Sequence, residues 1–162
     1  MFERLFTPWR LAYVTSQDDA GAVCALCRAR DGGEVAERLV VHRGALCFVV
    51  MNLYPYTSGH VMVTPNRHIG SLGAASPEEL AEMMSLAQRL EQAFREEYRP
   101  DGVNLGMNLG RAAGAGIADH IHLHVVPRWS GDTSFMTVVS DTRVLPETPD
   151  QACERLRRRF AR

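Results

Sequence analysis

The segment from Asp119 to Val126, DHIHLHVV, constrains the fold of this chain more than any other part of the sequence. Half of the six histidines recur here at every second position, with aliphatic residues between them. Successive side chains of a β-strand point to opposite faces, so the alternation predicts a strand over 119–127 with its aliphatic side chains in the core. The face opposite the core then carries His120, His122 and His124.

Other segments predict the rest of an α+β fold. Short runs rich in β-branched and aromatic residues, bounded by turn residues, predict four more strands, at 46–51, 60–64, 102–108 and 134–139. Ser76-Pro77-Glu78-Glu79 is typical of a capping box, and apolar residues then recur at helical spacing up to Pro100. A second helix is predicted from near Pro149. We therefore expect a mainly antiparallel five-stranded sheet with one long helix and a C-terminal helix.

The 162 residues suit a single domain, residues 1–162. It divides into an N-terminal extension of about 1–30, a core of about 35–140 and a C-terminal helix of about 149–161. With 18 Lys and Arg against 19 Asp and Glu, no basic field favours nucleic acid or an anionic membrane, and a small-molecule partner is expected. The chain has no apolar run near the roughly 20 residues of a membrane span and no signal-peptide pattern at its start, which predicts a cytoplasmic location.

The three alternating histidines favour catalysis over a merely polar sheet face. Their imidazoles stand about 7 Å apart along a strand, too far for all three to hold one metal ion. A neutral imidazole can attack phosphorus while a neighbouring one donates a proton. The glycine-rich loop 110–116 is able to bring backbone N–H groups close to an anion.

Two of the four cysteines, Cys24 and Cys27, have the spacing of half a zinc site. Buried thiols or a redox pair are the alternatives, although the strand-to-helix context of a redox motif is absent. A disulfide framework is not expected. His42 and His60 are isolated in the sequence and are assigned no role.

The pattern His120-x-His122-x-His124-Val-Val resembles the signature of the histidine triad family of nucleotide hydrolases and transferases. Asn52, eight residues before His60, lies in a segment that resembles the family's ribose-binding strand and turn, and the resemblance covers roughly residues 35–130. Thr7-Pro8-Trp9-Arg10 and Pro127-Arg128-Trp129 are similar to the branch of diadenosine tetraphosphate phosphorylases and hydrolases. The resemblance implies the histidine triad fold, with its sheet continued across a homodimer.

The resemblance also implies roles for individual residues. His122 would be the nucleophile that takes a nucleotidyl group, and His124 would bond phosphate oxygens and assist the leaving group. Asn52 would hold the ribose. The phosphate region would be contacted by Asn108 and by the loop Gly114, Ala115 and Gly116, where Gly116 and Ile117 replace the Gln or Ser side chain of many relatives.

In zinc-containing branches of the family, the first histidine of the triad is tied to a structural metal. The resemblance implies His68 and His120 as partners of Cys24 and Cys27 in a closed four-ligand zinc site.

The sequence therefore favours an enzyme that attacks the nucleotidyl phosphorus of a dinucleoside polyphosphate through a nucleotidyl-histidine, resolved by phosphate or water. Three alternatives stay open. One is a nucleoside phosphoramidate hydrolase of the same family. The second is a metal-dependent hydrolase that uses His120 and His122 as a His-x-His pair. The third is a nucleotide-binding module without catalysis.

Overall fold

The computed structural model describes residues 24–133 and 144–161, which form one five-stranded sheet and the helices around it. Neighbouring strands are antiparallel throughout, in the order β1-β2-β3-β5-β4, which confirms the predicted sheet. The strands are β1 (Val40–Arg43), β2 (Cys47–Met51), β3 (Val61–Pro65), β4 (Gly102–Gly106) and β5 (Leu123–Arg128).

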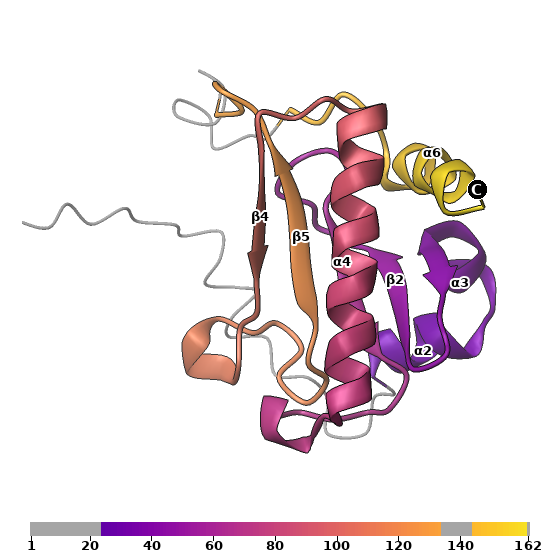
Figure 1. Cartoon of the computed structure of the whole chain (residues 1–162), viewed down its shortest axis with the longest axis vertical. Helices are drawn as coiled ribbons and strands as arrows, with labels where there is room; N and C mark the ends of the chain where they lie inside the picture. Colours follow the sequence, from indigo (N-terminus) through magenta and orange to yellow (C-terminus); the bar gives the residue numbers. More distant parts are fainter. Residues whose placement is uncertain (1–23, 134–143, 162) are drawn as a thin grey trace, which may run out of the picture.

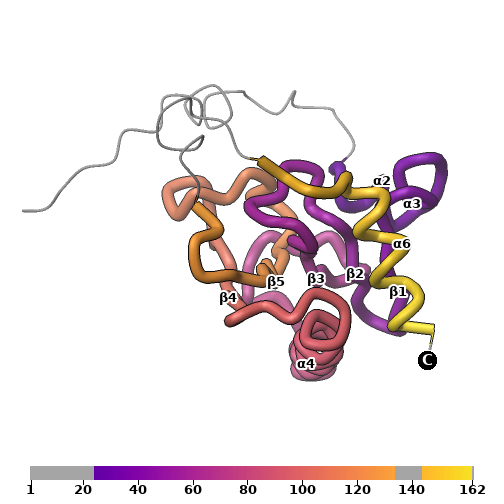
Figure 2. Tube along the Cα trace, turned by 90° about the horizontal axis from the view of Figure 1, so that it is seen from above, coloured from indigo at the N-terminus to yellow at the C-terminus, as the bar shows by residue number. Residues whose placement is uncertain are grey.

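The long helix α4 (Pro77–Glu97) runs along one face of the sheet (Figures 1 and 2). It begins with the predicted capping box: Ser76 Oγ accepts from the Glu79 N–H at 3.2 Å, and a Glu79 carboxylate oxygen accepts from the Ser76 N–H at 2.7 Å. Its buried stripe includes Met83, Leu90 and Phe94, so its amphipathic spacing becomes the core contact between helix and sheet.

Three shorter helices lie at the β1 end of the sheet: α2 (Ala25–Asp31), α3 (Glu34–Leu39) and α6 (Pro149–Phe160) (Figure 2). The position of α6 was predicted, whereas α2 and α3 were not. Arg157 of α6 donates from Nε to the Val40 carbonyl oxygen at 2.8 Å, which ties the C-terminal helix to β1.

The strand predictions need two corrections. Strand β1 was not predicted, and β5 begins at Leu123 rather than at residue 119, because residues 118–120 form a turn and the Ile121 N–H donates to the Ile69 carbonyl oxygen before the ladder with β3 starts. Ile121, Leu123 and Val125 are at most 7% exposed, as predicted for core residues, and His120 and His122, which alternate with them, are equally buried, at 0% and 5%. The predicted strand 134–139 lies outside the described residues.

The inner strands β2 and β3 and the edge strand β4 differ in burial. Strands β2 and β3 are buried along their whole length, whereas β4 is an exposed edge strand on which the Leu105 side chain is 51% exposed. Within the ranges 24–133 and 144–161, no helix has the length and apolar character needed to cross a membrane.

Candidate functional site

His122 is buried and is held in one tautomer by the backbone. Its Nδ1 lies 2.8 Å from the His120 carbonyl oxygen, and a carbonyl can only accept, so Nδ1 carries the proton. The Nε2 lone pair is therefore free, which is the form of imidazole that attacks phosphorus. The ring of His124 stands edge-on to it, with ring centroids 4.9 Å apart.

A second hydrogen-bond chain fixes the proton of His124. The Tyr56 N–H donates to Nδ1 of His60 at 3.1 Å, so the proton of neutral His60 is on Nε2. That nitrogen lies 3.0 Å from Nδ1 of His124 and donates to it. The proton of neutral His124 is then on its own Nε2, from which it can donate a hydrogen bond to a substrate oxygen.

The electrostatic environment keeps the histidines uncharged. Burial lowers the pKa of His122 below its ordinary value, against the opposing effect of its hydrogen bond to the His120 carbonyl. Burial, with a smaller contribution from His122, lowers the pKa of His124 to about 4. Both imidazoles are therefore neutral near pH 7, as an attacking nitrogen requires.

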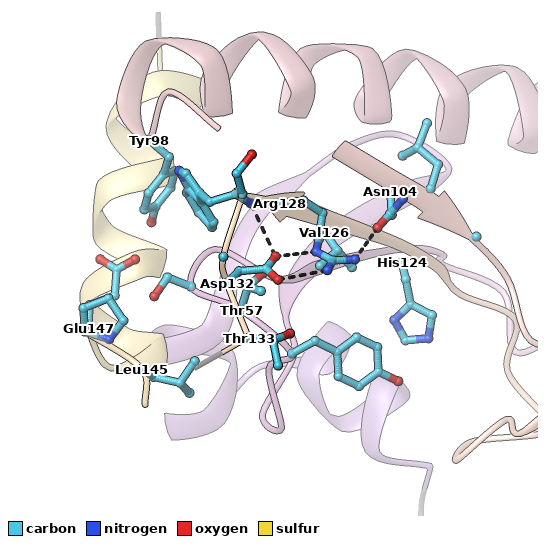
Figure 3. A pocket seen from close by; sticks show the side chains of 18 of the residues that line it. Thr57, Tyr98, Asn104, His124, Val126, Arg128, Asp132, Thr133, Leu145 and Glu147 are labelled. Carbon is cyan, nitrogen blue, oxygen red and sulfur yellow. Dashed lines mark hydrogen bonds and ion pairs between the residues drawn. The ribbon is translucent and has the colours of Figure 1, made fainter. Parts of the chain in front are cut away.

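A cavity of about 1040 Å³ opens beside His124 (Figure 3). Asn108 and Ala113 are among the residues that line it, and Tyr98 and Glu147 line the end away from His124 (Figure 3). On its wall, Arg128 donates to Asn104 Oδ1 at 2.8 Å and to both oxygens of Asp132 at 2.5 and 3.0 Å. The cavity is large enough for an extended ligand that starts at His124.

The structure places Asn52 against His60. The Asn52 side chain accepts from the Tyr54 N–H at 2.9 Å, and its amide nitrogen lies 3.3 Å from His60 Nε2. Its predicted contact with a ribose stays a prediction. His60, to which the sequence assigned no role, is fully buried between Asn52 and His124. Its distance of eight residues from Asn52 was the only signal of this contact.

The predicted phosphate loop lies next to Asn108, whose amide nitrogen donates to the Gly114 carbonyl oxygen at 3.3 Å. The N–H groups of Gly114 and Ala115 donate within the loop, to the carbonyl oxygens of Arg111 and Gly110. A phosphate at this loop would therefore depend on the N–H of Gly116 or on a shift of the loop. The assignment of Gly114, Ala115 and Gly116 stays a prediction.

Four residues from three distant segments form a cluster that could hold a metal ion. The ligand atoms of Cys24, Cys27, His68 and His120 all lie within 4.8 Å of one another. Nδ1 of His120 is 3.5 and 3.6 Å from the two sulfur atoms, and Cys27 Sγ is 3.4 Å from Nδ1 of His68. His120 Nε2 donates to the Pro65 carbonyl oxygen at 2.9 Å, which leaves Nδ1 as the ligand atom. Two thiolates and two imidazoles are a tetrahedral zinc-type donor set.

Comparisons with known proteins agree with this geometry. The family model of the HIT domain matches residues 33–131. An AP-4-A phosphorylase of Mycobacterium tuberculosis is 38% identical over 155 residues, covering 90% of this chain and 77% of that protein. A bis(5'-adenosyl)-triphosphatase of Dictyostelium discoideum is 32% identical over 83 residues, covering 51% of this chain and 55% of that protein. A Zn-bound histidine triad family protein from Mycobacterium smegmatis superposes with a TM-score of 0.68 at 32% identity, covering 85% of this chain and 93% of that chain.

The chain belongs to the histidine triad family. Its triad is the row of His120, His122 and His124, in which the first histidine faces the metal-ligand cluster and the other two face one another. Relatives named as dinucleoside polyphosphate enzymes support a nucleotide-processing enzyme.

Proposed function

We propose that this protein cleaves a dinucleoside polyphosphate such as diadenosine tetraphosphate by nucleotidyl transfer to His122. The observation that carries the proposal is the tautomer of His122, whose Nδ1–H donates to the His120 carbonyl and leaves Nε2 unprotonated. The name of the AP-4-A phosphorylase relative supports this substrate class.

The reaction has two steps. Nε2 of His122 attacks the phosphorus that carries one nucleoside, an N–P bond forms and the P–O bond to the remaining phosphates breaks. The Nε2–H of His124, which His60 orients, donates a hydrogen bond to the leaving oxygen, and the remaining phosphate chain departs as its anion. Inorganic phosphate or water then attacks the same phosphorus, the N–P bond breaks with its electron pair returning to Nε2 of His122, and the acceptor's proton is released to solvent.

The metal-ligand cluster is proposed to hold structural zinc. His120 lies within a closed set of four ligands that does not include His122, so the pair His120 and His122 is not arranged around one open metal site. Bound zinc would cross-link helix α2 to the segments that carry His68 and His120. This arrangement argues against the metal-dependent hydrolase.

We also propose that the exposed edge strand β4 pairs with its counterpart in a homodimer. Among residues 24–133 and 144–161, β4 has a neighbouring strand on one side only, and this edge, with the 51% exposed Leu105, offers both hydrogen-bonding groups and apolar surface to a second copy. Light scattering after size exclusion tests this: a monomeric mass at micromolar concentration contradicts it.

Incubation of the purified protein with diadenosine tetraphosphate, with and without inorganic phosphate, tests the proposed reaction. ADP and ATP formed only with phosphate identify a phosphorylase, and AMP and ATP formed without phosphate identify an asymmetric hydrolase. Nucleotide binding without any product, also with a nucleoside phosphoramidate, contradicts the proposal and favours a binding module.

A further inference from the structure

In the described part of the chain, the buried side-chain oxygens and nitrogens without a hydrogen-bond partner belong to three residues. These are Ser58, Tyr98 and Glu147. All three line the cavity that begins at His124, and Tyr98 and Glu147 lie together at its far end (Figure 3). Buried polar atoms are almost always paired, so a cluster of unpaired ones in one cavity indicates a missing polar ligand.

The residue after Ser58 packs against the Tyr98 ring, and Glu147 lies at the same end of the cavity as Tyr98 (Figure 3). A Cβ atom added at Gly59 would lie 3.3 Å from Cε2 and 3.4 Å from Cζ of Tyr98, so the Ser58-Gly59 turn packs against the hydroxyl end of the tyrosine ring. Burial, followed by the Glu147 carboxylate, raises the pKa of Tyr98, which places the carboxylate near the phenol and keeps the hydroxyl protonated. Neighbouring Thr57 differs, because its hydroxyl donates to the Pro127 carbonyl oxygen at 2.8 Å.

The buried carboxylate of Glu147 determines which chemical groups the ligand must have. Its side chain is only 10% exposed, and its nearest cation, Arg155 Nε, is 3.4 Å away, which balances the charge but makes no hydrogen bond to either oxygen. A carboxylate only accepts, so the ligand must supply two adjacent donors, which a fully ionised phosphate does not have.

A ribose diol meets these conditions better than a base does. Its two vicinal hydroxyls can donate to the two carboxylate oxygens and accept from the hydroxyls of Ser58 and Tyr98; carboxylates bind ribose hydroxyls in dinucleotide folds in the same way. A stacked base would need an open aromatic face. The Tyr98 ring already contacts the Arg155 guanidinium at 5.4 Å and the edge of Trp129 at 6.3 Å.

We propose that Glu147, with Ser58 and Tyr98, binds the ribose of the second nucleoside, the one that departs with the leaving group. This inference rests on the proposed function, since it places the attacked phosphorus at the His124 end of the cavity and the far nucleoside at the other end. It predicts that the protein selects substrates with a nucleoside at both ends of the phosphate chain.

Two substrates that differ only in the second nucleoside test the proposal: diadenosine tetraphosphate and adenosine 5'-tetraphosphate. The wild-type protein is expected to show a KM about tenfold lower for the dinucleotide, the effect of one or two charge-assisted hydrogen bonds. Glu147→Gln should bring the two KM values together. The matched control Glu154→Gln, an exposed residue of α6, should keep the tenfold difference. If Glu147→Gln does not fold, Ser58→Ala should reduce the difference by a smaller factor.

A mixed dinucleotide with 2',3'-dideoxyadenosine as the leaving nucleoside isolates the diol. Its KM should match that of adenosine 5'-tetraphosphate. The number of phosphates on the adenosine product and on the dideoxyadenosine product shows which end was attacked. Equal KM values for all three substrates, or a dideoxy substrate that binds like the full dinucleotide, overturn the proposal. If no substrate is turned over, the proposed function fails. Calorimetry with the same three ligands then tests the ribose site by itself: the dissociation constant should be lowest for diadenosine tetraphosphate and higher and similar for the other two.

Discussion

His60 Nε2 lies 3.0 Å from Nδ1 of His124, although the two residues are 64 positions apart in the sequence. The bond joins the turn after β2 to the third histidine of the triad, and it decides which nitrogen of His124 carries the proton. His60 is the donor in this bond, because its other nitrogen, Nδ1, accepts from the Tyr56 N–H and its own proton is therefore on Nε2.

His60→Gln should therefore lower kcat by roughly 10²-fold, because His124 loses the donor that holds its proton on Nε2. The rate of diadenosine tetraphosphate cleavage measures this. His42→Gln, which changes a histidine packed against Phe160 and away from the site, should leave kcat unchanged. A His60 variant that folds and turns over at the wild-type rate would contradict the role of this bond.

The pH dependence of the reaction follows from the lowered pKa values of His122 and His124, the latter to about 4. Both groups lose activity by gaining a proton, so kcat/KM should stay level at neutral pH and fall only in a limb below the ordinary histidine pKa of about 6.5. The unfolded chain binds these protons first, so the free energy of unfolding should also decrease as pH falls from about 6.5 to about 4. An acid limb centred above pH 6.5 is the outcome that excludes this account.

Metal removal should destabilise the protein, because the four ligands come from α2 and its N-cap Cys24, the segment after β3 and the segment before β5. Cys24→Ser and a strong chelator are each expected to lower the free energy of unfolding by more than about 3 kcal/mol and to reduce activity with it. Metal content by elemental analysis should fall from one zinc per chain. Cys47→Ala, which removes a buried thiol outside the cluster, should keep the zinc. Full metal loss with unchanged stability would show that the cluster is not structural.

Glu79 links the start of α4 to the segment that carries His68. Hydrogen bonds from Arg67 and from the Ser76 N–H lower the pKa of Glu79 to about 2. Because its folded pKa lies below the unfolded one, the carboxylate stabilises the fold above about pH 4.5, and this stability is lost as pH falls toward 2.

Glu79→Gln should therefore lower the free energy of unfolding by about 1–2 kcal/mol at pH 7 and by less at pH 3. Denaturant unfolding at the two pH values measures this, with the exposed Glu154→Gln of α6 as control. An equal loss at both pH values would assign the effect to packing instead of charge.

The sequence predicts elements whose signal is local. The alternation around His122 gives the two faces of β5, and Ser76 with Glu79 gives the start of α4. It does not predict β1, because Val40–Arg43 is only four residues long and follows a helix without a turn signal. It also misses the pairing of His60 with His124, since a contact between distant segments has no local pattern. The four metal ligands were assigned through family resemblance and not from spacing, which showed only Cys24 and Cys27.

The covalent intermediate at His122 is the central claim, and rapid quench with mass spectrometry tests it most directly. The protein is mixed with diadenosine tetraphosphate without phosphate, quenched within one turnover at alkaline pH, where an N–P bond survives, and digested for peptide mapping. A nucleotidyl group on the peptide that contains His122, absent in His122→Asn and discharged to ADP when phosphate is added, is the predicted result. Turnover without any adduct on this peptide, or a His122→Asn variant with the wild-type rate, would contradict it.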